Sequence, residues 1–186
     1  MQRISSIDPA NAAGKGKDLL DGVQAQLGRT PNLMKTLATA PAALDAYLLF
    51  SAALGKGSLD AKFREQIALT VAQANFCEYC LSAHSAIGER MGLKPEEISA
   101  SRQARAHDTK RNAGLQFAQT LVLKRGDVSD QVLADAKAAG FTEGEITEIV
   151  ANVALNLFTN YFNLVARTDI DFPNVGVNLQ PGDRAR

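Results

Sequence analysis

Residues 76–84 read FCEYCLSAH, and this stretch, together with the helix predicted before it, decides how the chain is interpreted. It holds the only two cysteines of the sequence, three positions apart, and one of its two histidines follows four positions later. Asn75 is a favourable N-cap residue, and Glu78 stands three positions after it as in a capping box. We therefore expect a helix to open here and to run towards Met91, with both sulfurs in its first turns.

Helix geometry relates the three reactive side chains to one another. Cys77 and Cys80 stand at positions i and i+3, close enough for a disulfide after local adjustment, and His84 lies one turn beyond Cys80 on the same face. The positive end of the helix dipole favours a thiolate over a thiol. We expect Cys80 to be the nucleophile, His84 to take its proton, and Cys77, on an exposed first turn, to be the resolving thiol.

A carboxylate in the preceding segment is a candidate partner for the histidine. Phe63, Ile67 and Val71 repeat at helical spacing, and Glu65 lies off the centre of that stripe among neighbours that also look buried. An acid in such surroundings needs a partner, so we expect Glu65 to orient His84 or to carry its proton. The alternative is a surface acid paired with Lys62.

A cysteine pair followed by a histidine also occurs at zinc sites. A structural site needs four ligands, and the only further His or Cys is His107, which is expected to be solvated near a helix boundary. A catalytic zinc on three ligands within two turns stays open, although its geometry would be strained. Haem attachment is excluded because Leu81 follows the second cysteine. We therefore expect no bound cofactor and no metal.

Composition limits the class of protein. The chain has 186 residues, of which 46% are hydrophobic, and its 20 basic and 20 acidic side chains cancel. These values indicate one domain with a sizeable core, and they predict neither a nucleic-acid surface nor a membrane segment. No secretory leader is recognised, so we expect a cytoplasmic protein in which a cysteine pair is catalytic and not a structural disulfide.

Period-3.6 patterns prevail along the chain, so we predict an all-α fold, a compact multi-helix single domain. The domain is expected to span residues 1–171, and residues 172–186 are expected to form a C-terminal tail. Besides the motif helix, a preceding helix capped by Ser58 and a short helix opening at Pro95, the predicted helices are 18–27, 30–37, 41–54, 110–124, 129–139 and 142–157.

Two weaker patterns lie near the C-terminus. Residues 67–72 align with residues 149–154, which predicts an internal helix-pair repeat unless the apolar match is fortuitous. Asparagines follow at helical spacing, and this polar stripe would line a subunit interface, border the active site or face water. The stripe consists of Asn152, Asn156, Asn160 and Asn163.

Glu65, Cys77, Cys80 and His84 form the pattern Glu-x11-Cys-x2-Cys-x3-His, which resembles the alkylhydroperoxidase D-like proteins of the carboxymuconolactone decarboxylase superfamily. The stretch at residues 155–163, which continues to the DFP sequence near residue 172, is similar to the peroxidase-related subgroup. One position departs from the founding proteins, which carry a histidine just before the second cysteine where this chain has Tyr79. We expect Tyr79 to be at most an auxiliary hydrogen-bond donor to a sulfenate or peroxide, since its high pKa makes it a poor base.

The resemblance implies a thiol-dependent hydroperoxide reductase of alkylhydroperoxidase D-like fold. It also implies a homo-oligomer, a trimer or hexamer, and an external dithiol reductant, either a lipoyl-type carrier or a protein thiol. Two alternatives stay open. One is a lactone decarboxylase of the same superfamily, which works without a cysteine pair. The other is a non-enzymatic redox sensor or scaffold whose disulfide switches a partner.

Overall fold

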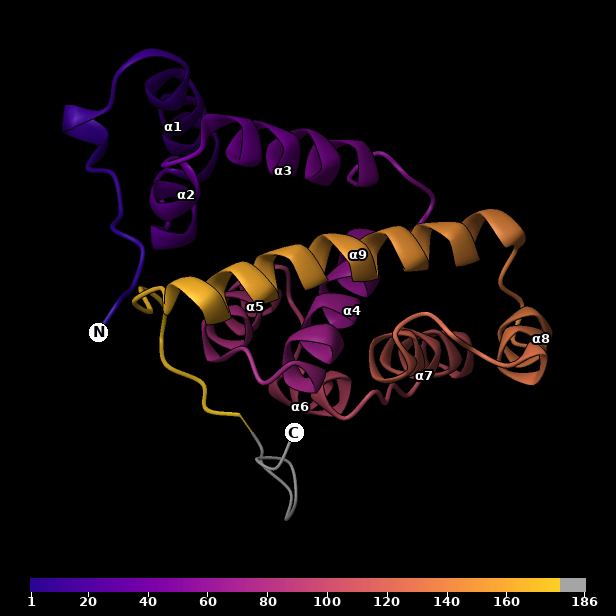
Figure 1. Ribbon diagram of the computed structural model, residues 1–186. Coiled ribbons are helices and arrows are strands. Elements are labelled where there is room, and N and C mark those ends of the chain that lie inside the picture. The colour runs from indigo at the N-terminus through magenta and orange to yellow at the C-terminus, as the bar shows by residue number, and fades with distance from the viewer. Residues whose placement is uncertain (178–186) are drawn as a thin grey trace.

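The computed structural model describes residues 1–177, and within this range the ordered elements are all helical (Figure 1). This confirms the all-α prediction. A short 3₁₀ helix at Pro9–Asn11 precedes the α-helices. These are α1 (Gly14–Leu27), α2 (Asn32–Leu37), α3 (Pro41–Leu54), α4 (Ala61–Ala74), α5 (Glu78–Arg90), α6 (Pro95–Arg102), α7 (Thr109–Lys124), α8 (Asp130–Ala138) and α9 (Glu143–Ala166).

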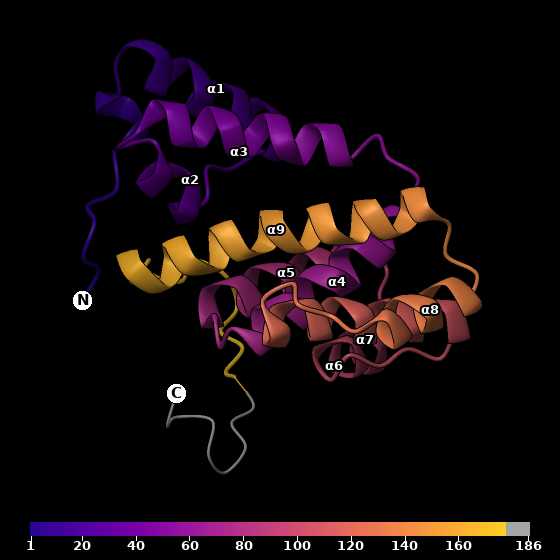
Figure 2. The same ribbon diagram turned by 45° about the vertical axis from the view of Figure 1, so that its right-hand side comes forward.

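The helices are arranged around α4 and α9. Helices α1, α2 and α3 lie together on one side of α9, and α4 to α8 lie on the other (Figures 1 and 2). Helix α4 packs against α5, α6, α7 and α9, whereas α3 contacts α1, α2 and α9. The motif helix α5 therefore lies in the interior of the fold, beside both long central helices.

The core divides into two hydrophobic clusters that α4 joins. One cluster contains both cysteines and Leu69 of α4, and the other contains Phe63 and Ile67 of the same helix. Burial of a leucine or isoleucine side chain contributes about 1.5–3 kcal/mol, so a helix buried on both faces is held firmly. The motif turn that follows α4 is thereby placed on a rigid support.

Several predicted helix boundaries were wrong, and α1, for example, begins at Gly14 and not at residue 18. Helix α4 is capped by Asp60, whose side chain accepts a hydrogen bond from the Phe63 N–H at 3.0 Å, and not by Ser58. Helix α9 extends to Ala166, beyond the predicted end at residue 157. Its asparagines do not interrupt it, because the amide of Asn156, for example, donates to the carbonyl of Asn152 within the helix at 2.9 Å.

The predicted internal repeat of two helix pairs is also wrong, because the second pair is absent. The break between α4 and α5 depends on Phe76, which has a positive φ of 55°. The aligned residue Phe158 lies inside α9, which continues without a break from Glu143 to Ala166. One helix pair is therefore matched by a single long helix.

By length and composition alone, α9 could cross a membrane. The sequence predicts this helix only as far as residue 157, and it predicts no membrane segment. Its buried residues include four asparagines, and it packs on α3, α4, α5 and α7. These contacts indicate the core helix of a folded domain.

The expected boundary between domain and tail at residue 172 does not coincide with a change in packing. The ring of Phe172 meets that of Tyr79 edge to face at 5.8 Å, and the Val175 N–H donates to Ser82 Oγ at 2.9 Å. Residues 172–177 thus belong to the domain. The rest of the predicted tail, residues 178–186, lies outside the described residues.

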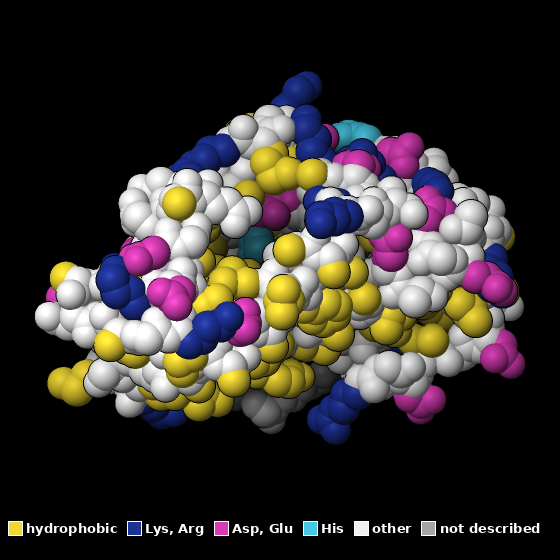
Figure 3. Space-filling view, turned by 90° about the horizontal axis from the view of Figure 1, so that it is seen from above, with side chains coloured by type: hydrophobic (Ala, Val, Ile, Leu, Met, Phe, Trp, Pro, Cys, Tyr) yellow, Lys and Arg dark blue, Asp and Glu magenta, His cyan; other side chains and the backbone are white. Residues whose placement is uncertain are grey.

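Hydrophobic side chains gather on the face of the molecule formed by α3 and α9 (Figure 3). We call this set the α3–α9 apolar surface. Its large exposed members are Leu49, Phe50, Val150, Phe158, Tyr161, Leu164 and Val165.

Candidate active site

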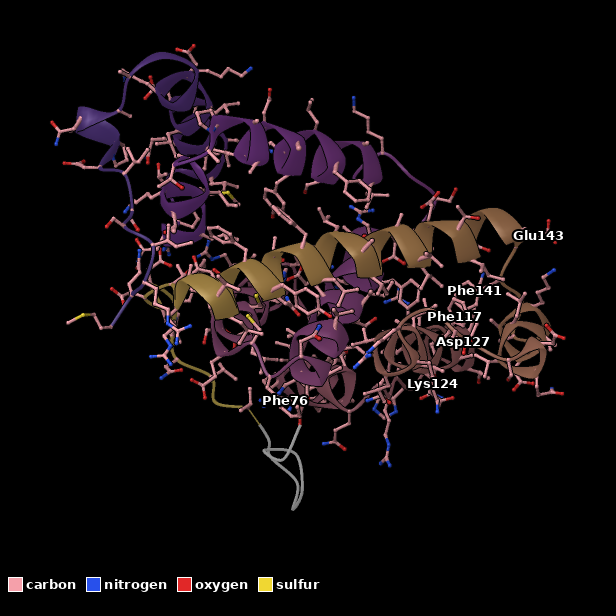
Figure 4. All side chains as sticks on the ribbon, viewed as in Figure 1. Phe76, Phe117, Lys124, Asp127, Phe141 and Glu143 are labelled. Atoms are coloured by element: carbon pink, nitrogen blue, oxygen red, sulfur yellow. The ribbon has the colours of Figure 1, made fainter. Side chains whose placement is uncertain are left out.

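The turn between α4 and α5, marked by Phe76 in Figure 4, differs from the predicted capping box. Asn75 is the C-cap of α4, and its amide donates to the Val71 carbonyl and to Asn160 Oδ1, both at 3.0 Å. Cys77 is the N-cap of α5, and its Sγ accepts a hydrogen bond from the Cys80 N–H at 3.4 Å. The asparagine side chain is thus used to end one helix, and a sulfur begins the next.

The two cysteines are free thiols with their Sγ atoms 2.6 Å apart. Both side chains are buried, at 1% exposure for Cys77 and 2% for Cys80. The expectation of an exposed Cys77 was wrong, because the first turn of α5 packs into the core and not against solvent. Cys80 borders the main cavity, whereas Cys77 lies behind it and is not part of the cavity wall.

The structure brings Glu65 and His84 together. His84 Nδ1 lies 2.6 Å from Glu65 Oε1, which links α5 to α4 beside the cysteine pair. Burial alone would lower the pKa of His84, but the charge of Glu65 and its hydrogen bond, with a smaller contribution from Cys77, raise it above the ordinary value. The pair therefore favours an imidazolium next to a carboxylate.

We expected His84 to take the proton of Cys80, but the structure shows no hydrogen bond between them through which it would pass. Among the hydrogen bonds of residues 1–177, none joins this imidazole to either sulfur. The charge of His84 instead acts on Cys77, where it contributes to a lowered pKa. One turn of helix brings the imidazole near the sulfurs, while its hydrogen bond is directed to Glu65.

The two thiols have opposite pKa shifts. A hydrogen bond from Cys80 lowers the pKa of Cys77, with help from the Cys80 backbone N–H and against the effect of burial. Burial, followed by the neighbouring Cys77, raises the pKa of Cys80. In the resting pair the negative charge is therefore favoured on Cys77, and the proton on Cys80.

A cavity of about 910 Å³ opens at this site. Figure 3 shows a hollow on this face, with histidine and acidic side chains at its base among hydrophobic ones. Cys80, Glu65 and His84 line it, and much of the remaining wall comes from apolar side chains of α1, α2 and α3. These include Leu19, Val23, Leu33, Met34, Leu48 and Leu54.

Tyr79 does not serve as the expected donor to the site. Its hydroxyl donates to Asp171 Oδ1 at 2.9 Å and accepts from the Leu33 N–H at 3.0 Å. Asp171 also accepts from the Asn32 N–H at 3.0 Å and pairs with Arg29. The hydroxyl thus donates its only proton to the C-terminal segment, and its two hydrogen bonds link α5 to that segment and to α2.

Sequence reasoning did not single out Tyr47 of α3. This side chain lines the cavity. Burial and the nearby charges of Cys80 and Glu65 raise the pKa of Tyr47 to about 12, so it stays a proton donor. A phenol in a mostly apolar helix is a weak signal, and its contact with the site depends on tertiary packing.

The second unassigned residue is Asn163 of α9, whose Nδ2 lies 3.3 Å from Cys80 Sγ. The asparagine stripe was visible in the sequence, and the structure places it on the buried face of α9. His107 lies elsewhere, at the edge of a second, smaller hollow. Across the described residues, no three His, Cys, Asp or Glu side chains are grouped so as to hold a metal ion.

The fold and the site together define an all-helical protein with a buried CxxC pair and a Glu–His pair on one cavity. The model of the carboxymuconolactone decarboxylase family matches residues 40–120, which include Glu65, both cysteines and His84. Over this segment the chain is similar to that family. A comparison with curated proteins found no match.

Solved structures show the same fold over nearly the whole chain. A peroxidase-related protein from Ralstonia eutropha JMP134, described as an alkylhydroperoxidase core, has 24% identity and a TM-score of 0.80, covering 91% of this chain and 92% of its own. A peroxidase-related protein from Silicibacter sp. TM1040 has 21% identity and a TM-score of 0.79, with coverages of 90% and 91%. The debrominase Bmp8, in a complex with 2,3,4-tribromopyrrole, has 18% identity and a TM-score of 0.76 over the same shares. These similarities establish the alkylhydroperoxidase-type fold.

Proposed function

We propose that this protein is a thiol peroxidase that reduces an alkyl hydroperoxide and stores the oxidising equivalents as a Cys77–Cys80 disulfide. One observation carries the proposal. Cys80 borders a largely apolar cavity, with the second sulfur 2.6 Å behind it. An attacking thiol with a resolving thiol in contact is the arrangement that this chemistry needs.

The first step takes place on Cys80. The proton of the Cys80 thiol moves to the Cys77 thiolate, so that the negative charge passes to Cys80. The Cys80 thiolate then attacks the terminal oxygen of the hydroperoxide. The O–O bond breaks, a sulfenic acid forms on Cys80, and the departing alkoxide takes a proton to leave as an alcohol. Tyr47 and the His84 imidazolium both line the cavity and are the candidate donors of that proton.

The second step forms the disulfide. Cys77 loses its proton, for which the lowered pKa is favourable, and attacks the sulfur of the Cys80 sulfenic acid. The S–S bond forms as the S–O bond breaks, and the leaving hydroxide takes a proton to become water. Glu65 holds His84 in the protonated form that favours the thiolate of Cys77.

An external dithiol completes the cycle. It reduces the disulfide through a mixed disulfide, is itself oxidised to a disulfide, and returns two thiols to the site. Because both sulfurs are buried, we propose a reductant with a slender arm, such as a lipoyl-type carrier, in preference to a thiol on a flat protein surface. Proteins with accessible dithiols, such as thioredoxin, are the alternative.

Steady-state peroxide consumption tests the function. Cumene hydroperoxide and hydrogen peroxide are each supplied with dihydrolipoamide, thioredoxin or glutathione as the reductant. Because the debrominase Bmp8 has the same fold, 2,3,4-tribromopyrrole is tested in a separate assay as an alternative substrate. We expect turnover of cumene hydroperoxide with a dithiol, its loss in Cys80→Ser, and a trappable sulfenic acid on Cys80 in Cys77→Ser.

Other outcomes point to the alternatives. A single oxidation without turnover would indicate a redox sensor or scaffold, and turnover that survives Cys80→Ser would remove this residue from the mechanism. Sulfenic acid trapped on Cys77, with turnover intact, would exchange the roles of the two cysteines. Activity on a lactone substrate independent of both cysteines would indicate a decarboxylase.

A further inference from the structure

Four asparagines lie on the buried face of α9, and they fall into two pairs. Asn152 and Asn156 donate their side-chain amides to carbonyls of their own helix, at 2.8 Å and 2.9 Å. Asn160 and Asn163, one helical turn nearer the cysteines, do not follow this pattern. Their amides are directed away from the α9 backbone and towards the motif turn.

The contacts of the second pair converge on Cys80. Asn163 Nδ2 lies 3.3 Å from Cys80 Sγ. Asn160 Oδ1 accepts from Asn75 Nδ2 at 3.0 Å, and because Asn75 also donates to the Val71 carbonyl, the orientation of the Asn160 amide is settled by its partner. The oxygen of Asn160 therefore meets the α4 end, which leaves its Nδ2 as the free donor.

Each of these two buried amides has one atom without a partner. Asn160 is 0% exposed and Asn163 is 3% exposed, and both the Nδ2 of Asn160 and the Oδ1 of Asn163 lack a hydrogen bond within the described part of the chain. Such atoms are costly in a protein interior and call for an explanation. One is a donor and the other an acceptor, on successive turns of the helix that faces Cys80.

We propose that Asn160 and Asn163 form a cradle for the reactive states of Cys80, as hydrogen-bond donors to its thiolate and as the donor and acceptor that hold its sulfenic acid. Asn163 contacts the reacting sulfur and is the catalytic member of the pair, whereas Asn160 is oriented by Asn75. The sulfenic acid part of this inference rests on the proposed peroxidase function; the thiolate part does not.

The electrostatics of the site explain why Cys80 needs hydrogen-bond donors. Cys80 is buried next to a second sulfur whose pKa is lowered, and burial raises the pKa of Cys80 itself. The side-chain amides of Asn163 and Asn160 act in the opposite direction and lower the pKa of Cys80. The imidazole of His84 bonds to Glu65 and not to Cys80, so these amides and the α5 N-terminus are available to stabilise the Cys80 anion. The titratable groups around Cys80 are Cys77 and the phenols of Tyr47 and Tyr79.

A sulfenic acid fits the two unpartnered atoms. Its oxygen accepts one hydrogen bond and its O–H donates another, so the Nδ2 of Asn160 and the Oδ1 of Asn163 complement it. Attack on the hydroperoxide forms the S–O bond and breaks the O–O bond, so the new hydroxyl appears on the sulfur that these amides face. The cradle would hold that group while Cys77 approaches from behind.

Alkylation of Cys80 by iodoacetamide, measured against pH in the Cys77→Ser background, tests the thiolate part without any peroxide. We expect Asn163→Leu to slow alkylation at neutral pH by about tenfold and to move the profile to higher pH, as for loss of one hydrogen bond to a charged group. Asn163→Asp, which keeps the shape of the side chain but adds a negative charge, should slow it further. Asn152→Leu is the matched control. Asn152 is an equally buried amide of α9 that donates to the main-chain carbonyl of Glu148, and the alkylation profile of Cys80 in this variant should not move.

The Asn163→Asp variant keeps the test decisive where the leucine variant does not fold, as judged by circular dichroism. Unchanged profiles for Asn163→Asp and for Asn160→Leu would overturn the cradle. The sulfenic acid is tested by its lifetime towards dimedone after one equivalent of cumene hydroperoxide, which should fall in Asn160→Leu. A shifted alkylation profile with no sulfenic acid in any variant, wild type included, would retain the thiolate cradle and reject the peroxidase.

Discussion

Nδ1 of His84 lies 2.6 Å from Oε1 of Glu65, and this contact joins α5 to α4 beside the cysteine pair. The carboxylate raises the pKa of the imidazole, and the resulting positive charge helps to lower the pKa of Cys77. The relationship between Glu65 and His84 therefore sets the charge available to the thiols, although no hydrogen bond among the described residues connects the imidazole to a sulfur.

The first prediction concerns Glu65→Gln. A neutral amide no longer stabilises the imidazolium, so the pKa of His84 should fall and that of Cys77 should rise. We expect iodoacetamide to alkylate Cys77 several-fold more slowly at neutral pH in the double variant Cys80→Ser/Glu65→Gln than in the single variant Cys80→Ser. His84→Ala should have the same effect, and the combination should be little worse than either change, since the two residues act as a unit. A profile unaffected by Glu65→Gln would return Glu65 to a structural role.

The same pair predicts a pH dependence of stability. The pKa of His84 is raised in the folded protein above its ordinary 6.5, so the pair stabilises the fold fully below that pH, and the stabilisation is lost as pH rises through the folded-state value. The difference in Tm between wild type and Glu65→Gln should therefore be largest near pH 6 and should shrink in alkaline buffer. A difference that grows towards alkaline pH would contradict the assigned direction.

The third prediction concerns the sulfurs. With their Sγ atoms 2.6 Å apart, Cys77 and Cys80 should form a reversible intramolecular disulfide under mild oxidant. Mass spectrometry after differential alkylation should show the loss of two hydrogens on the peptide that holds both residues, and a dithiol should restore them. Separate sulfinic acids on each cysteine would contradict the pairing.

The fourth prediction tests the structural role of Tyr79. Tyr79→Phe removes the bonds to Asp171 and to the Leu33 N–H, which leaves the buried Leu33 N–H without this partner, whereas Asp171 keeps Arg29 and the Asn32 N–H. We expect a loss of about 1–3 kcal/mol in the free energy of unfolding, measured by urea denaturation. The alkylation profile of Cys80 should stay as in wild type, whereas a marked shift would give Tyr79 a direct part in the chemistry.

Much of this architecture was predictable from local patterns. Helix α3 was placed at its observed bounds by Pro41 and by the glycines that follow Leu54, and the spacing of Cys77 and Cys80 correctly placed their sulfurs close together. The capping at the motif turn was not predictable in this way, because it depends on the positive φ of Phe76.

Contacts between distant segments account for the remaining differences. Asn163 is separated from Cys80 by 83 positions, and only the packing of α9 on α5 brings the amide to the sulfur. Likewise, Cys77 is buried because the first turn of α5 faces the core, which helical spacing alone does not reveal. Tyr47 reaches the cavity through the packing of α3, and its own sequence context contains no motif.

The last prediction concerns assembly. The α3–α9 apolar surface includes Tyr161 at 57% exposure and Val165 at 61%, on a helix whose opposite face is buried in the core. Contiguous exposed apolar side chains of this kind mark association sites, and a stable interface buries about 1,000 Å² or more. We therefore propose that copies of the chain associate through this surface into a homo-oligomer, with a trimer or hexamer as the expected size.

Light scattering on the purified protein at micromolar concentration should give a mass that is a multiple of 19.8 kDa. Tyr161→Glu should shift that mass towards the monomer, because a carboxylate in an apolar interface has no partner for its charge. Leu123→Glu, at a 54% exposed leucine of α7 outside the α3–α9 apolar surface, is the matched control and should leave the mass unchanged. A wild-type mass near that of one chain would refute the assembly, and an oligomer that resists Tyr161→Glu but dissociates in Leu123→Glu would place the interface elsewhere.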